Sequence, residues 1–239
     1  MLVHLDQSAD SGRFDAAAEA NHRIANHLSM IISIMRLHAK RLKAQPEPVS
    51  GAELSLLLTG IGEKVETIAR LHRELAHVQD GEQVDLGEYL RKITDGVVSS
   101  LAPARTDLRF LLDADCMVTG NQALPIGLII CEVVTNSMKY AHPTGVPGRL
   151  KVVCRRSAGQ IVIEVADDGV GMPDGFDPAT GGQIGFNSIR ALAGQLGATL
   201  RFSSDGLGVT FELRIPLAEA GAAARRRGVT TAPPTVPAA

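Results

Sequence analysis

The chain has no tryptophan, and aromatic residues make up only 3% of its 239 residues. Its three cysteines, Cys116, Cys131 and Cys154, are scattered among apolar neighbours, which argues against a disulfide framework or a zinc-binding module. No apolar run approaches the length of a membrane span, and the N-terminus lacks a signal-peptide pattern. The formal net charge of −2 argues against a nucleic-acid-binding protein. What remains is a globular protein of one or two domains, for which a cytoplasmic location is predicted.

The N-terminal part of the chain carries a long helical pattern that is interrupted once. From Ile24 to Leu42, six residues, all apolar except His38, recur at alternating spacings of four and three, as in the seam of a helical bundle. Two prolines and a glycine in 45–51 break this helix, and the same rhythm resumes over 54–75. The pattern predicts an antiparallel helical hairpin. Because one hairpin cannot cover its own apolar stripe, we expect two copies to pair as a homodimeric four-helix bundle.

The remaining sequence mixes strands and helices after a polar break at 79–83. Asp85 is expected to cap a helix that ends near Leu101. We predict an α+β protein in which helices cover one face of a mixed sheet. The expected strands are 108–112, 150–155, 160–166, 199–203 and 209–215, and the expected later helices contain 132–141 and 185–196. The predicted domains are a short lead at 1–13, the hairpin at 14–79, a second domain at 84–217 and a disordered tail at 218–239.

Three short blocks carry the chemistry. In the helix predicted around 131–142, Glu132, Asn136 and Lys139 follow one another at i, i+4 and i+7, so they share one face. An amide oxygen can ligate Mg²⁺, and a lysine can meet phosphate. The second block, 165–172, is an apolar run that closes in an acidic, glycine-rich turn, and the third, 181–186, is rich in glycine. Taken singly, the two glycine blocks are ordinary turns or linkers, but the ordered set is specific.

In this order the blocks resemble the N, G1 and G2 boxes of the ATP-binding fold that histidine kinases share with Hsp90-type chaperones and mismatch-repair ATPases. In addition, His22-Arg23-x-x-Asn26 resembles the HRxxN phosphoacceptor signature of the HWE histidine kinases and of their sibling, the second HisKA subfamily. The HWE group carries a Trp-x-Glu motif, and this chain has no tryptophan, so the sibling subfamily is favoured. The resemblance covers about residues 14–217.

The resemblance implies a role for each matching residue of the phosphoryl-transfer machinery. His22 would attack the γ-phosphorus of ATP, and Asn26 would orient that histidine or a hydrolytic water. Asn136 would bind Mg²⁺, and Glu132 would hold a metal-bound water. Lys139 and His142 would face the phosphates, and Tyr140 would lie near the nucleotide.

The resemblance also implies how the base is recognised. Asp167 would accept a hydrogen bond from the exocyclic amine of adenine, and a carboxylate selects adenine over guanine there because it cannot donate. Gly169 and Gly171 would let the backbone pass close to the base. Gly182 and Gly185 would let the segment over the nucleotide turn tightly.

The implied function is an ATP-dependent protein-histidine kinase that passes its phosphoryl group to an aspartate of a response-regulator receiver domain. A histidine phosphotransferase or response-regulator phosphatase on a kinase-like dimer is the alternative, and an anti-sigma-factor kinase or ATP-gated clamp is a third. Two positions depart from other histidine kinases: Ala25 stands where a lysine is frequent, and Arg23 leaves the general base unassigned. Because only a short segment precedes His22, either the chain is truncated or a separate sensor protein delivers the signal.

Overall fold

A computed structural model describes residues 32, 35, 36, 39, 43, 50–78, 82–101, 106–144, 146–173, 175–176, 184–204 and 206–217. The first helix of the expected hairpin therefore lies almost wholly outside the described residues. The same holds for the lead at 1–13 and the tail at 218–239, so the predictions made for these segments stay predictions.

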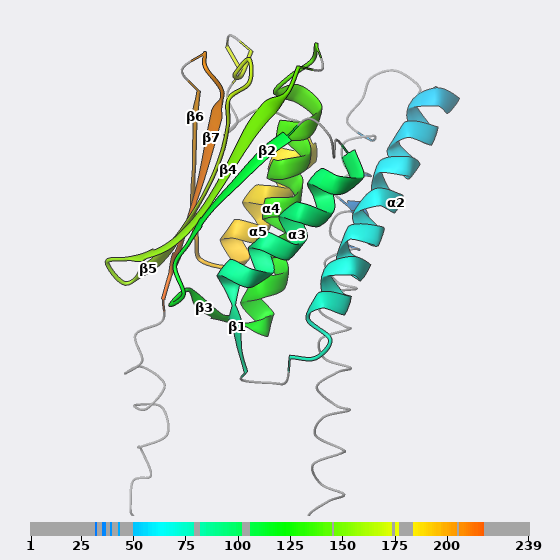
Figure 1. The fold of residues 1–239 in the computed structure, drawn as a ribbon. Helices are drawn as coiled ribbons and strands as arrows, with labels where there is room; N and C mark the ends of the chain where they lie inside the picture. The colour runs from blue at the N-terminus through cyan, green and yellow to red at the C-terminus, as the bar shows by residue number, and fades with distance from the viewer. Residues whose placement is uncertain are drawn as a thin grey trace, which may run out of the picture.

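A mixed five-stranded sheet forms one layer of the molecule, in the spatial order β2-β4-β5-β7-β6 (Figure 1). Its strands are β2 (Thr106–Leu112), β4 (Gly148–Ser157), β5 (Gln160–Asp167), β6 (Thr199–Ser204) and β7 (Val209–Pro216). Only β2 and β4 run parallel, and the other neighbouring pairs are antiparallel. The connection between β2 and β4 contains helix α4, because parallel neighbours need a long crossover.

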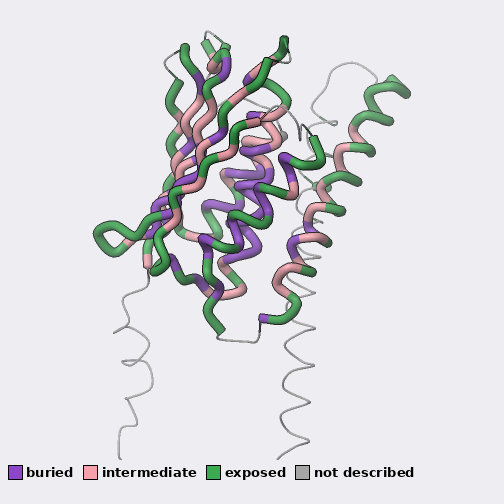
Figure 2. Tube along the Cα trace, viewed as in Figure 1, coloured by how far each residue is buried: buried purple, intermediate pink, exposed green. Residues whose placement is uncertain are grey.

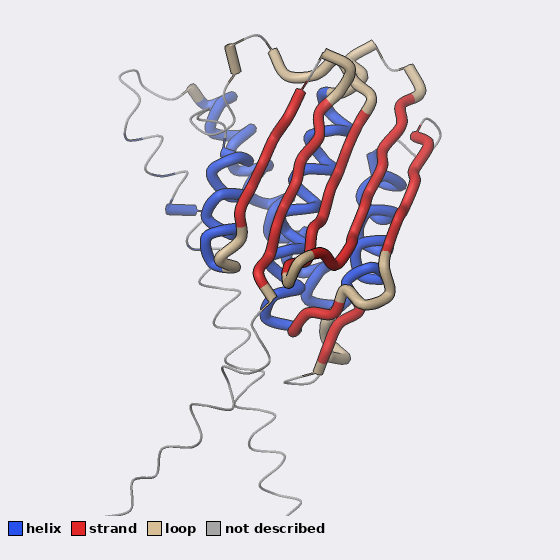
Figure 3. Tube along the Cα trace, turned by 90° about the vertical axis from the view of Figure 1, so that its left-hand side faces the viewer, coloured by secondary structure: helices blue, strands red, loops and turns tan. Residues whose placement is uncertain are grey.

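Three helices cover one face of this sheet, and none of the described helices covers the other (Figures 1 and 3). They are α3 (Leu86–Leu101), α4 (Gly120–Tyr140) and α5 (Ile184–Gln195). Strand β7 alternates to match: Phe211, Leu213 and Ile215 are fully buried, and the residues between them are only partly buried. The predicted α+β class, with helices on one face of a mixed sheet, is confirmed.

Helix α4 lies at the centre of the core, because it packs against α2, α3 and α5 as well as the sheet. Most of its N-terminal half is buried, and Ile126, Ile129 and Ile130 are fully buried. The packing against α3 is tight: a Cβ added at Gly127 would lie 2.4 Å from the hydroxyl of Tyr89. The N-terminal half of α4 is therefore held rigidly, and the polar residues expected to carry the chemistry, Glu132, Asn136 and Lys139, lie in its C-terminal half.

Helix α2 (Gly51–Glu74) begins at the last residue of the predicted Pro/Gly break. Its start is a capping box, in which the Glu53 N–H donates to Ser50 Oγ and the Ser50 N–H donates to the Glu53 carboxylate. Toward its C-terminal end, Ile68 and Leu71 are buried in the same core as α4 and the sheet. Its N-terminal half is largely exposed (Figure 2). Among the described residues, no helix is both long and apolar enough to span a bilayer.

Two short strands were missed in the sequence. β1 (Gln83–Asp85) pairs antiparallel with β3 (Met117–Thr119), next to the first turns of α3 and α4. Three residues are too few to show an alternating pattern. The predicted cap is confirmed nearby, since the Glu88 N–H donates to Asp85 Oδ1 at 3.1 Å.

Candidate functional site: a cavity at the C-terminal end of α4

A cavity of about 300 Å³ lies between the last turns of α4, the end of β5, the turn that follows it, and strands β6 and β7. Most of its lining residues are apolar, and its polar side chains include Asn136, Ser137 and Asp167. A cavity with an apolar wall and a few polar groups is typical of a small-molecule site. The residues of the first two blocks, far apart in sequence, therefore meet around one cavity.

The carboxylate of Asp167 is fixed by three donors. Its Oδ1 accepts the backbone N–H of Gly169 at 3.2 Å and of Val209 at 3.1 Å, and its Oδ2 accepts the Ser137 hydroxyl at 2.7 Å. An ionised carboxylate only accepts hydrogen bonds, so the remaining lone pairs of Asp167 can receive only a donor from a ligand. Ser137 was not singled out in the sequence, although it directly follows Asn136.

The turn after β5 is pressed against the end of α4. The Val170 N–H donates to the Ala141 carbonyl at 2.9 Å, and a Cβ added at Gly169 would lie 2.4 Å from the backbone of Ala141. Gly171 has φ +78°, a backbone conformation that favours glycine. Both glycines of this block therefore have a structural requirement, and Gly171 lines the cavity.

Four of the six phenylalanines form a continuous row along the cavity wall. The ring centroids are 5.4 Å apart between Phe176 and Phe186, 5.2 Å between Phe186 and Phe202, and 5.1 Å between Phe202 and Phe211. Tilted and edge-on rings at these spacings attract one another beyond the burial of their surfaces. The row was not predicted, because its members are isolated in the sequence. The scarcity of aromatic residues elsewhere was the available signal.

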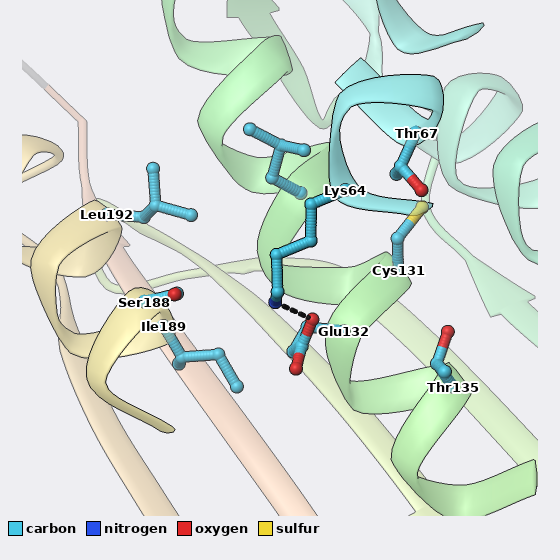
Figure 4. A pocket seen from close by; sticks show the side chains of 9 residues that line it. Lys64, Thr67, Cys131, Glu132, Thr135, Ser188, Ile189 and Leu192 are labelled. Carbon is cyan, nitrogen blue, oxygen red and sulfur yellow. Dashed lines mark hydrogen bonds and ion pairs between the residues drawn. The ribbon is translucent and has the colours of Figure 1, made fainter. Parts of the chain in front are cut away.

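The polar residues of α4 divide between this cavity and helix α2. Asn136 and Tyr140 line the cavity, and Tyr140 is 61% exposed at its mouth. Glu132 lines a separate, smaller cavity, where its carboxylate pairs with Lys64 Nζ of α2 at 2.7 Å (Figure 4). Lys139 lies 3.9 Å from the carboxylate of Glu63, also on α2. The helical face predicted from the spacing is real, but two of its three residues face α2.

His142 contacts the acidic turn rather than lining the cavity. Its Nε2 lies 2.9 Å from Asp168 Oδ1, which also accepts the Arg149 backbone N–H at 2.7 Å. Partial burial raises the pKa of the Asp168 carboxyl, but the bonds from Arg149 and His142 outweigh it and hold that pKa below its ordinary value. The contact between His142 and Asp168 holds the C-terminal end of α4 against the turn after β5.

Gly185 lies at the start of α5, where a Cβ would lie 2.2 Å from the Glu132 carboxylate. Three of the predicted site residues, His22, Asn26 and Gly182, lie outside the described residues.

The described part of the chain offers no group of three or more His, Cys, Asp or Glu side chains that could hold a metal ion by themselves. The three cysteines are free and buried. Burial raises the pKa of the Cys131 thiol to about 11, so this group stays protonated at neutral pH. The cavity and its polar groups suit a purine nucleotide, because the apolar wall can take the base while the fixed Asp167 carboxylate takes an amine donor.

Two family models match the chain. Residues 19–101 match the model described as "Histidine kinase", and residues 121–219 match "Histidine kinase-, DNA gyrase B-, and HSP90-like ATPase". The first match covers most of the predicted hairpin and α3. The second covers α4, α5 and strands β4 to β7, which surround the cavity. The first model is that of the second HisKA subfamily, so the family and the subfamily expected from the sequence are confirmed.

Named relatives agree with these matches. The chain is 27% identical over 208 residues to blue-light-activated histidine kinase 2 of Erythrobacter litoralis, covering 84% of this chain and 57% of the relative. It is 28% identical over 207 residues to the sensor histidine kinase PdtaS of Mycobacterium tuberculosis, covering 85% and 40%. The chain thus spans about half the length of these curated relatives. A solved histidine kinase domain from the Erythrobacter litoralis blue-light activated kinase superposes with a TM-score of 0.64 at 26% identity, covering 85% of this chain and 94% of that domain.

Proposed function

Because this chain belongs to the histidine kinases, we propose that it transfers the γ-phosphoryl group of ATP to His22 and then to an aspartate of a response-regulator receiver domain. The observation that carries the proposal is the Asp167 carboxylate, held by three donors inside an apolar cavity. Such a group would accept the exocyclic amine of adenine and reject guanine, which offers an oxygen at that edge.

The other cavity residues fit the remaining parts of ATP. The phenylalanine row would pack against the base, and Tyr140 at the exposed mouth would lie beside the nucleotide. Asn136 would offer its amide oxygen to Mg²⁺, which neutralises charge on the phosphates when it is bound. Lys139, 46% exposed on its side chain, is long enough to turn from Glu63 toward a phosphate. His142 would reach a phosphate only by leaving Asp168.

In the proposed reaction, the neutral imidazole of His22 supplies an electron pair to the γ-phosphorus. The bond from this phosphorus to the oxygen bridging to the β-phosphate breaks, so ADP leaves with that electron pair. Asn26, four residues after His22 in the sequence, would orient the ring or a hydrolytic water. Glu132 would hold a water near the metal ion, once its carboxylate is free of Lys64.

We further propose that the protein acts as a homodimer. The N-terminal half of α2 leaves Leu54, Leu56 and Leu58 between 44% and 76% exposed, as expected for a helix that another helix would cover. The proposed domains are those predicted from the sequence: 14–79 for dimerisation and phosphotransfer and 84–217 for ATP. The use of ATP and three unoxidised cysteines suit a cytoplasmic protein.

Labelling with γ-³²P-ATP and Mg²⁺ tests this function. We expect an acid-labile, base-stable label on the protein that is absent from His22→Ala and Asn136→Ala. His77→Ala serves as the control, because the proposal gives that histidine no role and its label should equal that of the wild type. If ATP binds but no protein is labelled, the kinase proposal is wrong. Loss of phosphate from a phosphorylated receiver domain would then support the phosphotransferase or phosphatase alternative.

A further inference from the structure

The ion pair between Lys64 and Glu132 joins the hairpin to the ATP-binding layer. Lys64 Nζ lies 2.7 Å from Glu132 Oε2, and the two side chains are only 21% and 24% exposed (Figure 4). A charge-assisted bond of this length is stronger than one between neutral groups, and partial burial reduces its screening by salt. It therefore stabilises the contact between α2 and α4 more than the exposed ion pair of Lys139 with Glu63 does.

The Glu132 carboxylate is enclosed from two sides. Lys64 of α2 binds one oxygen, and the other lies where a Cβ of Gly185 would stand, 2.2 Å away. The cavity at this point is about 50 Å³ and is also lined by Ser188 and Leu192 of α5. Glu132 is absent from the lining of the larger cavity that holds Asn136 and Asp167. In this arrangement the carboxylate is therefore directed away from the proposed nucleotide site.

Helix α2 is anchored at one end, so a change in its tilt would act on this ion pair. Ile68 and Leu71, one and two turns beyond Lys64, are buried in the core. On the other side of Lys64, Leu58 is 59% exposed, and the neighbouring pair of Glu63 with Lys139 is longer, at 3.9 Å, and more exposed. Motion of the more exposed N-terminal half of α2 can thus separate Lys64 from Glu132 without disturbing the buried anchor.

We propose that Lys64 is a positioning residue that withholds Glu132 from the nucleotide site, so that the tilt of α2 controls phosphorylation. This inference rests on the proposed function, in which Glu132 holds a water near the metal ion. Separation of the pair frees the carboxylate to turn toward Asn136, one helical turn farther along α4. The hairpin proposed to carry His22 in its other helix would in this way also regulate the site that phosphorylates it.

The test compares full-chain variants that alter Lys64 alone. Lys64→Met keeps the length and packing of the side chain but removes its charge, and we expect the initial rate of autophosphorylation at saturating ATP to rise about fivefold, which equals about 1 kcal/mol. Lys64→Arg keeps the charge and should stay near the wild-type rate. Lys92→Met is the matched control, because Lys92 makes an exposed pair with Glu88 on α3. The KM for ATP should be unchanged in all three variants.

Hydrogen exchange of the α2 amides gives a readout that does not depend on activity. Lys64→Met and Glu132→Gln should each speed exchange around residue 64, and the double variant should add nothing further, since both remove one interaction. A Lys64→Met rate at or below that of an active wild type overturns the inference, as does unchanged exchange. If no protein is labelled yet exchange responds as described, the proposed function fails while the contact assigned to Lys64 stands.

Discussion

Two substitutions of Asp167 separate its structural role from its proposed role in recognising adenine. Asp167→Ala removes the acceptor of two backbone N–H groups and of the Ser137 hydroxyl. At about 1 kcal/mol for each hydrogen bond, the free energy of unfolding should fall by about 3 kcal/mol. Asp167→Asn keeps an oxygen for the two backbone donors, and its NH₂ can donate to the Ser137 oxygen. The asparagine variant should therefore lose about 1 kcal/mol or less.

For Asp167→Asn, the expected loss of nucleotide affinity is larger than the expected loss of stability. In the asparagine variant an NH₂ group would stand where Oδ2 is now, so it would face the adenine amine with another donor. Loss of a charge-assisted hydrogen bond costs about 1.5–3 kcal/mol, which corresponds to a roughly 10- to 100-fold weaker affinity for ATP. A stable protein with weak binding is thus expected from Asp167→Asn.

Urea unfolding measures the first quantity, and displacement of a fluorescent ATP analogue measures the second. Ser137→Ala is the companion variant, because it removes one donor to Asp167 and leaves the carboxylate in place. It should lower the affinity less than Asp167→Asn does. Wild-type affinity in a folded Asp167→Asn protein would refute the assignment of the adenine contact, and equal stability of the alanine and asparagine variants would refute the hydrogen-bond argument.

Four other substitutions test the packing and the electrostatics of α4 and of the turn after β5. Gly127→Ala should destabilise the protein by about 1–3 kcal/mol in urea unfolding, because its Cβ would meet the Tyr89 hydroxyl. Tyr89→Phe should recover most of that loss, and the idea fails if it does not, since this hydroxyl is buried without a hydrogen-bond partner in the described structure. Gly169→Ala should push the turn away from Ala141 and weaken ATP binding at least about tenfold, so normal binding by fluorescence would contradict the close contact. Asp168 has a folded-state pKa below its ordinary value near 3.8, so it stabilises the protein above that pH and the contribution is lost as the pH falls through the lowered value. Asp168→Asn should therefore be less stable than the wild type at neutral pH and show a flatter acid branch, and parallel curves for the two proteins would exclude this role.

The sequence predicted the fold class and four of the residues that line the cavity, Asn136, Tyr140, Asp167 and Gly171, because both depend on local patterns. The alternation in β2, β6 and β7 follows directly from a sheet with one covered face, and the acidic glycine turn needs particular backbone geometry at Gly171. Asp85 was identified as a cap for the same reason. Such features depend on a few consecutive residues, so one sequence is enough to find them.

The features that were missed depend on contacts between distant segments. Lys64 is one of several lysines on amphipathic helices, and nothing in its neighbourhood indicates that Glu132 will lie 2.7 Å away. The phenylalanine row likewise joins four isolated residues from different elements. The sequence also placed Glu132, Asn136 and Lys139 on one face without revealing that α2 would contact two of them.

Helix α4 connects all the parts of the site, and its packing limits how the site can change. Its N-terminal half is fixed by fully buried isoleucines, while its last turns contact α2 through Glu132, the cavity through Asn136, and the turn after β5 through Ala141. A close-packed helix resists bending, because any distortion would open voids in the core. Control of the site by the hairpin is therefore more easily exerted through side chains that α2 can release than through movement of α4 itself. The partly exposed ion pairs between α2 and α4, Lys64 with Glu132 and Glu63 with Lys139, are the contacts that can be released in this way.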